Sequence, residues 1–137
     1  MPPIDIAAVL ARTPKLDITE ATTEADASAA FPRLAPFNQG GIFAGRFSGE
    51  TPWACHPGGD ELLYILDGVV EVTVLGDSGA EVTTARRGQI VVVPQGSWHK
   101  QRPLPEVTLL TATPTPSRIS DAADPRQVAA SQAAPTR

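Results

Sequence analysis

The sequence predicts an all-β protein, either a sandwich or a barrel, and three observations lead to this class. Residues 31–112 contain about eight short runs rich in β-branched and aliphatic side chains, spaced by roughly ten residues. Turn signals separate these runs, and they include Pro57, Pro94 and five of the 11 glycines of the chain. No run between them has the length and periodicity of a long helix.

The expected strands alternate with tight turns along the middle of the chain. The strongest turn signals are the Pro-, Gly- and Asp-rich segments 57–60, 77–79, 86–88 and 94–96. The strands that they delimit cover residues 41–47, 51–56, 61–68, 69–76, 80–85, 89–94, 97–101 and 107–113. Short strands at such even spacing are typical of a closed or two-layered antiparallel sheet.

The two ends of the chain differ from this middle part. Residues 1–30 are acidic and form an N-terminal extension, with a short helical turn or edge strand near its start and a short helical segment over 20–30. Residues 113–137 contain four prolines and almost no large apolar side chain. Such a segment buries too little surface to offset the entropy of ordering. We therefore expect a mobile C-terminal tail, or an arm that lies across the domain or a partner.

Composition excludes several classes of protein. The 137 residues suffice for one domain. A formal net charge of −4 and 5% aromatic residues do not fit a nucleic-acid-binding protein. The longest apolar runs are too short to span a membrane, and the first residues lack the pattern of a signal peptide. The single cysteine, Cys55, cannot form an internal disulfide, so a reducing, cytoplasmic location is expected.

Both histidines of the chain lie beside tight turns. His56 ends an expected strand, Glu61 begins the next one, and His99 follows the turn at 94–96. Because alternate side chains of a strand share a face, Ala54 and His56 point one way and Cys55 the other. A barrel that brings these turns together can direct His56, Glu61 and His99 into one cavity. Two imidazoles and one carboxylate leave open positions on a divalent ion.

The residues around His99 resemble the second sequence motif of the cupin family. That motif reads Gly-x5-Pro-x-Gly-x2-His, and Gly88, Pro94, Gly96 and His99 match it. Its closing Asn is replaced by Pro103.

The residues around His56 resemble the first cupin motif, Gly-x5-His-x-His-x(3 or 4)-Glu-x6-Gly. The second His, the Glu and the closing Gly are matched by His56, Glu61 and Gly68. Ala54 occupies the position of the first His, and Gly49 is one residue out of register with the opening Gly. The amino-acid sequence of residues 53–68 also resembles that of a group of small single-domain bacterial cupins. The resemblance to the family covers about residues 41–112.

The resemblance implies a cupin double-stranded β-helix, or jelly-roll barrel, over residues 31–112, flanked by irregular extensions at 1–30 and 113–137. It also implies a divalent transition metal (Fe, Mn, Ni, Zn or Cu) held by His56, Glu61 and His99. Ala54 offers no fourth ligand, which leaves water or Gln101 as candidates for that place. No catalytic residue beyond the ligands is implied. A homodimer is expected, because small cupins often pair through sheet faces or exchange terminal strands.

Three functions remain open from the sequence. The first is a metal-dependent protein acting on a small organic molecule by oxygenase, isomerase or lyase chemistry, whose metal binding weakens below about pH 6 as histidines protonate. The second, motivated by Ala54, is a metal-free module that binds or senses a small molecule, or isomerises it by acid–base chemistry. The third is a structural partner protein, which requires an exposed apolar sheet face. None of the three involves nucleic acid or a membrane.

Overall fold

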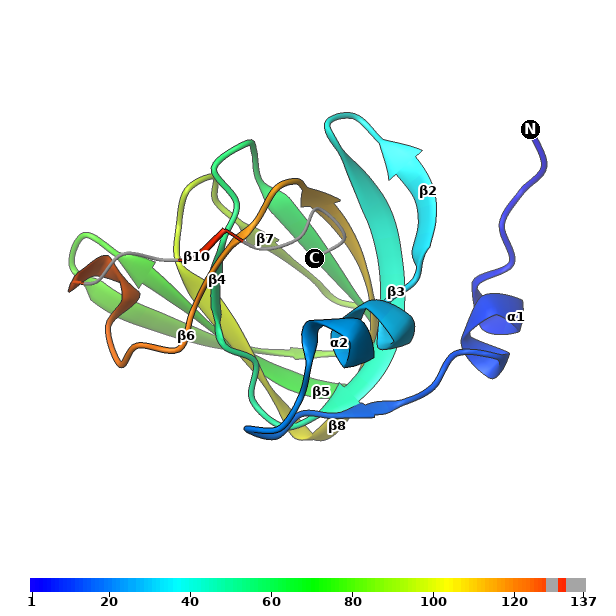
Figure 1. Ribbon diagram of the computed structural model, residues 1–137, viewed down its shortest axis with the longest axis horizontal. Coiled ribbons are helices and arrows are strands. Elements are labelled where there is room, and N and C mark those ends of the chain that lie inside the picture. The colour runs from blue at the N-terminus through cyan, green and yellow to red at the C-terminus, as the bar shows by residue number, and fades with distance from the viewer. Residues whose placement is uncertain (128–130, 133–137) are drawn as a thin grey trace.

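The computed structural model of the protein describes residues 1–127 and, for the backbone, residues 131–132. Strands dominate, and ten of them join in one sheet that curls into a barrel (Figure 1). The elements in chain order are α1 (Ile6–Ala11), β1 (Leu16–Asp17), α2 (Glu24–Ala30), β2 (Arg33–Phe37), β3 (Gly40–Ser48), β4 (Trp53–Cys55), β5 (Glu61–Gly76), β6 (Gly79–Arg86), β7 (Ile90–Val93), β8 (His99–Pro114), β9 (Arg118–Ser120), the 3-10 turn η1 (Pro125–Gln127) and β10 (Ser131–Gln132). The predicted all-β class is confirmed.

Two long antiparallel strands, β5 and β8, form the frame of the barrel. They pair with each other along most of their length, while β8 also pairs with β3 and β4, and β5 with β6 and β7. The sequence predicts two strands in place of each, namely 61–68 and 69–76 for β5, and 97–101 and 107–113 for β8. Instead, β5 continues through register shifts beside Gly68, whose φ of +81° bends the strand without ending it. The backbone of Glu106 also lies so close that a Cβ at position 68 would collide with it.

The core lies between the inner faces of these strands and the N-terminal segment. Leu63 and Ile65 alternate on the buried face before the register shifts of β5, Val70 and Val72 alternate on it after them, and all four are fully buried. At one end of the core the ring of Phe47 packs edge-on against that of Phe31, with centroids 5.4 Å apart. The residue after α2 is thereby tied to β3 and to the hydrophobic cluster.

Local signals explain the two short helices of the N-terminal extension. Asp5 caps α1 by accepting from the amide of Ala8, and Thr23 and Asp26 form a reciprocal capping box at the start of α2. α1 lies outside the barrel beside β3, and α2 lies at one end of it (Figure 1). No helix in residues 1–127 is long and apolar enough to cross a membrane.

The N-terminal extension is joined to the sheet. β1 pairs in parallel with β3, and the guanidinium of Arg46 on β3 donates to the carbonyls of Leu10 and Thr13. Ser48 donates to Asp17, which adds a side-chain link at the same place. Residues 13–17 are therefore fixed against the barrel wall.

The predicted boundary at residue 112 is too early. β8 runs on to Pro114, and β9 pairs with β4 through three residue pairs, so residues 113–120 include part of the sheet. In this stretch, backbone pairing and a fully buried Ser117 take the place of large apolar side chains. Of the predicted mobile tail, residues 128–130 and 133–137 lie outside the described residues.

Candidate metal centre

Hydrogen bonds join two turns that are far apart in the sequence, the turn at 57–60 and the turn at 94–96, at one end of the barrel. The amide of Gly96 donates to the carbonyl of His56 at 3.0 Å. The amide of Gln95 donates to Asp60 Oδ1, and its side-chain amide donates to the carbonyl of Pro57, both at 2.7 Å. The turn after β4 and the turn before β8 are thus fixed to each other, which brings His56 close to His99.

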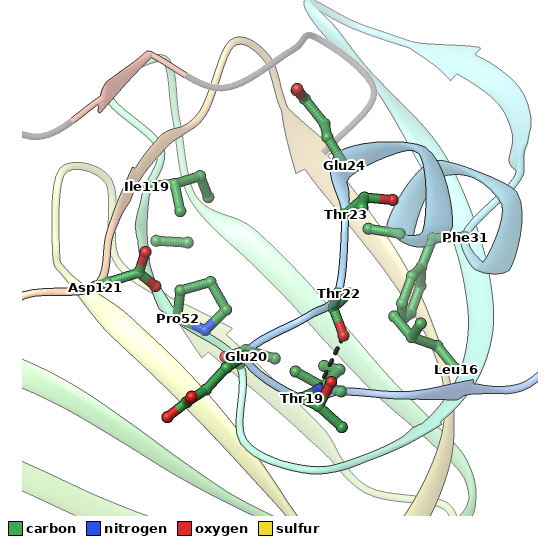
Figure 2. Close-up of a pocket in the computed structure, with 14 residues that line it drawn as sticks. Leu16, Thr19, Glu20, Thr22, Thr23, Glu24, Phe31, Pro52, Ile119 and Asp121 are labelled. Carbon is green, nitrogen blue, oxygen red and sulfur yellow. Dashed lines mark hydrogen bonds between the residues drawn. The ribbon is translucent and has the colours of Figure 1, made fainter.

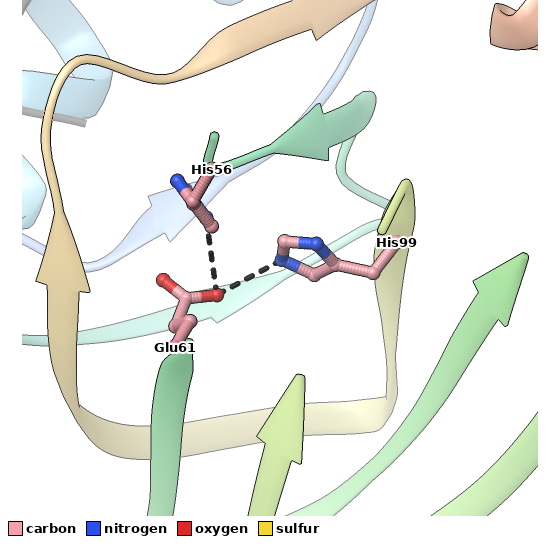
Figure 3. A group of neighbouring side chains, drawn as sticks. All are labelled: His56, Glu61 and His99. Carbon is pink, nitrogen blue, oxygen red and sulfur yellow. Dashed lines mark ion pairs between the residues drawn. The ribbon is translucent and has the colours of Figure 1, made fainter. Parts of the chain in front are cut away.

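Strand register completes the arrangement. His99, the first residue of β8, lies between Ala54 of β4 and Val74 of β5, while Glu61 is the first residue of β5. The side chains of His56, Glu61 and His99 point toward one another inside the barrel (Figure 3). Their exposed fractions are 3%, 0% and 1%. The structure therefore brings together all three residues that the sequence singles out.

The three side chains converge through specific atoms. Glu61 Oε1 lies 2.9 Å from His99 Nε2 and 3.3 Å from His56 Nε2, and the two imidazole centroids are 5.2 Å apart. Both Nε2 atoms thus face the same carboxylate oxygen. Metal–ligand bonds of about 2.0–2.2 Å place neighbouring ligand atoms about 3 to 3.5 Å apart. The spacing and the donor set therefore fit a divalent transition metal ion.

The electrostatics favour a charged carboxylate in this buried place. Burial alone would raise the pKa of Glu61, but His56 and His99 beside it outweigh burial and hold that pKa well below its ordinary value. The group is thus present as the anion at neutral pH. An anion flanked by two imidazoles is the form that a divalent ion requires.

Hydroxyl groups orient two of the three side chains. Thr113 donates to Glu61 Oε2 at 2.6 Å and is itself hydrogen-bonded to Thr111, and both threonines are buried. This contact turns the other oxygen, Oε1, toward the histidines. Ser117 lies 2.9 Å from His56 Nδ1. When Nε2 of His56 is a ligand, Nδ1 carries the ring proton, and this N–H donates a hydrogen bond to the hydroxyl oxygen of Ser117.

These supporting hydroxyls are absent from the sequence prediction. A signal exists for the two threonines, since Val107, Leu109, Thr111 and Thr113 alternate on the buried face of β8. Two polar side chains that continue the buried apolar face of a strand indicate a polar group inside the barrel with which they can hydrogen-bond. Ser117 carries no such signal, because it stands in a Pro-rich stretch that reads as a tail.

The remaining candidates divide between buried and solvent-facing positions. Gln101 is buried beyond His99 on β8, and its amide oxygen has no hydrogen-bond partner in the described part of the chain. Cys55 is a buried free thiol whose pKa is raised by burial, as a packed strand residue requires. Ala54 pairs with His99 and presents only a methyl group at the place where the motif has its first histidine. Strand β4 therefore supplies no side-chain ligand atom for a fourth position on the ion.

Fold and site together define a β-barrel protein with a buried His–His–Glu cluster at one end. Residues 47–102 match the sequence model of the cupin domain. This match bears out the resemblance to cupins that the two motifs predict, and solved structures of the same fold support a jelly-roll barrel. The comparison with curated protein sequences found no match.

Solved structures support the same fold. A cupin-2 domain protein from Shewanella frigidimarina is 22% identical, with a TM-score of 0.54, over 62% of this chain and 79% of its own. A conserved protein of unknown function from Streptococcus pyogenes is 24% identical, with a TM-score of 0.52, over 63% and 74%. A hydroquinone 1,2-dioxygenase, solved with Cd²⁺ and 4-hydroxybenzonitrile, is 18% identical, with a TM-score of 0.54, over 64% of each chain.

Proposed function

We propose that the protein binds one divalent transition metal ion through His56 Nε2, Glu61 Oε1 and His99 Nε2, and acts on a small organic molecule there. The observation that carries the proposal is the convergence of these three buried donor atoms, all within 4.8 Å of one another. Structures of the same fold include an enzyme solved with a divalent ion and an aromatic compound, which supports this class of function.

The residues of the chain have separate tasks in this function. A bound ion would supply a Lewis acid with open positions for substrate, water or dioxygen. Thr113 fixes the carboxylate and Ser117 fixes the imidazole of His56, so the donors are oriented before an ion arrives. The buried setting excludes water and strengthens the interaction between ion and carboxylate. Oxygenase, isomerase and lyase reactions are all consistent with this arrangement.

A thermal-shift screen tests metal binding in the purified protein. Chelator-treated protein is mixed with Mn²⁺, Fe²⁺, Ni²⁺, Cu²⁺ or Zn²⁺, and its melting temperature is recorded. An ion at one hundred times its dissociation constant stabilises the folded state by about 2.7 kcal/mol, which raises the melting temperature by several degrees. The rise should disappear when chelator is restored. If none of the five ions changes the melting temperature, the proposal is contradicted.

Replacing Ser117 by alanine should weaken metal binding without unfolding the barrel. The serine hydroxyl is the partner of His56 Nδ1, and loss of such a supporting group costs about 10- to 100-fold in metal affinity. The dissociation constant is measured by competition with a chelating dye. Ser78→Ala, at an exposed turn, is the matched control and should bind as the parent does. Equal affinities in the two variants would show that Ser117 does not orient the ligand.

A second candidate function is a metal-free module that binds a small molecule, and Ala54 is the observation that favours it. With a methyl group at that position, the protein offers one donor fewer than the full motif. In this reading Glu61 and the histidines form a buried polar group that orients the ligand or moves a proton. The two functions differ in one simple respect: chelation leaves ligand binding and the melting temperature unchanged only in the metal-free case.

We also propose that the protein forms a homodimer through the outer face of its sheet. Leu62 and Tyr64 of β5 stand directly opposite Val92 and Ile90 of β7, and these four side chains face outward. On the other side of β5, Leu62 and Tyr64 pair with Ala112 and Leu110 of β8. Ala112 in turn pairs with Ile42 of β3. A contiguous apolar face of this kind is typical of a surface that another protein covers.

The dimer is tested by light scattering after size exclusion. The parent protein should show twice the mass of one chain, and the double variant Ile90→Lys, Val92→Lys should show the mass of one. Val82→Lys places one lysine at another exposed valine, on β6, and should remain dimeric. A monomeric parent protein would exclude this proposal.

A further inference from the structure

A cavity of about 560 Å³ lies between the N-terminal segment and the end of the barrel (Figure 2). Leu16, Ile18 and Phe31 line its wall on the N-terminal side, and Pro52, Ala54 and Ile119 line it on the barrel side. The N-terminal wall is held in place, since β1 pairs with β3 and Lys15 forms an ion pair with Glu106 at 2.7 Å. The volume suits a small organic molecule, and the apolar walls suit a hydrocarbon body.

Ala54 is a neighbour of both the cavity and the His–His–Glu cluster, none of whose three residues lines the cavity itself. This residue lines the cavity and is also the register partner of His99. Directly opposite residues of an antiparallel pair point to the same face, with Cβ atoms about 4.5–5.5 Å apart. The methyl group of Ala54 thus stands beside the His99 side chain. A molecule that contacts Ala54 in the cavity is therefore separated from His99 by a small side chain.

All the charged side chains among the described residues that line the cavity are acidic. Glu20, Glu24 and Asp121 line it, on different sides in the view of Figure 2. None of the described residues that line it is a lysine, arginine or histidine. The whole chain has a formal net charge of −4, which adds to the negative potential. An anionic ligand would be repelled here, whereas a cation would be attracted.

We propose that this cavity is the substrate pocket of the metal centre and that it takes a small organic cation, an amine or ammonium compound with an apolar body. The apolar body contacts Phe31, Leu16 and Ile119, and the cationic group pairs with Glu20 and Asp121. The link to the metal centre rests on the proposed function. The choice of ligand rests on the cavity itself, so the two claims can fail separately.

Three ligands of the same size and different charge test the choice of ligand. The probes are 1-naphthylmethylamine, 1-naphthylmethanol and 1-naphthoate, and binding to the full-length protein is measured by titration calorimetry at neutral pH. The amine should bind about five-fold more tightly than the alcohol, and the carboxylate should bind more weakly than both. Equal binding of amine and alcohol, or preferred binding of the carboxylate, would overturn the proposal.

Two variants show whether binding occurs in this cavity. The double variant Glu20→Gln, Asp121→Asn should lose the preference for the amine while keeping the affinity for the alcohol. Ala27→Leu, which fills part of the cavity from α2, should weaken both ligands. The control variant Asp67→Asn, Glu81→Gln removes two exposed carboxylates that do not line the cavity and should bind as the parent does. If the control loses the preference equally, the binding is due to overall charge and the pocket is wrong.

Nuclear relaxation separates the pocket from the metal centre. Mn²⁺ should shorten the proton relaxation times of bound 1-naphthylmethylamine far more than Zn²⁺ does, because a paramagnetic ion acts only at close range. Selective amine binding to a protein that binds neither ion would confirm the ligand class and refute the proposed function. Metal binding without this enhancement would refute the assignment of the cavity to the metal centre.

Discussion

Replacing His99 by alanine should abolish stoichiometric metal binding while the barrel stays folded. His99 Nε2 lies 2.9 Å from Glu61 Oε1, and removal of the imidazole leaves one histidine and one carboxylate, too few protein donors for tight binding. Glu61→Ala should have the same effect, because it removes the anionic donor. Metal content is measured on protein purified without chelator, and the fold is checked by circular dichroism. In both variants we expect metal content to fall to background.

The controls keep this result interpretable. Glu81→Ala removes an exposed glutamate from β6 and should retain the metal content of the parent. Glu61→Gln keeps the size of the side chain and loses only the charge, so it separates metal binding from packing. Should His99→Ala or Glu61→Gln be purified with as much metal as the parent, the ion is bound elsewhere and the assigned ligands are wrong.

Replacing Phe47 by alanine should lower the free energy of unfolding by about 3–5 kcal/mol, the range for a fully buried phenylalanine. The ring lies in the hydrophobic cluster and packs against Phe31, so its loss leaves a void and weakens the attachment of the N-terminal segment. Since Phe31 lines the cavity, the variant should also bind the naphthyl amine less tightly. Denaturant unfolding gives the stability, and calorimetry gives the affinity.

A matched phenylalanine is available on the surface. Phe37 is 53% exposed at the end of β2, and Phe37→Ala should change the stability by no more than about 0.5 kcal/mol. Similar losses in the two variants would mean that Phe47 does not pack in the core as described.

The site residues could be found from the sequence because each lies at a fixed distance from a turn. His56 and Glu61 flank the turn at 57–60, and His99 follows the turn at 94–96, so closure of the sheet brings the two turns together. Cross-links such as the hydrogen bond from Gln95 to Asp60 depend on the folded chain and have no pattern in the sequence. Asp60 itself reads as an ordinary turn residue.

The extensions were less predictable than the barrel. Residues 1–30 do contain the short helices that their caps indicate, yet nothing in the sequence shows that Leu16 and Ile18 build one wall of a cavity together with Phe31, the first residue of the predicted barrel range. β9 is a three-residue strand with no apolar run, stabilised by its pairing with β4. Such segments are ordered by contacts distant in sequence, which local propensity does not encode.

Strand continuity is a further point on which local signals mislead. Gly68 closes the first motif and ends the expected strand 61–68, which the next expected strand, 69–76, follows directly. In the fold it is a bend inside β5, required by a positive φ and by the nearby Glu106 backbone. A glycine in a strand pattern therefore marks either a turn or a bulge, and only the pairing partners decide between them.

Elemental analysis of the native protein tests the central claim most directly. Protein expressed in rich medium and purified without chelator is analysed by plasma mass spectrometry for Fe, Mn, Ni, Cu and Zn, alongside its His56→Ala and His99→Ala variants. We predict close to one transition metal ion per chain in the parent and a background level in both variants. A parent protein with metal at background, folded and able to bind its organic ligand with unchanged affinity after chelation, would contradict the account.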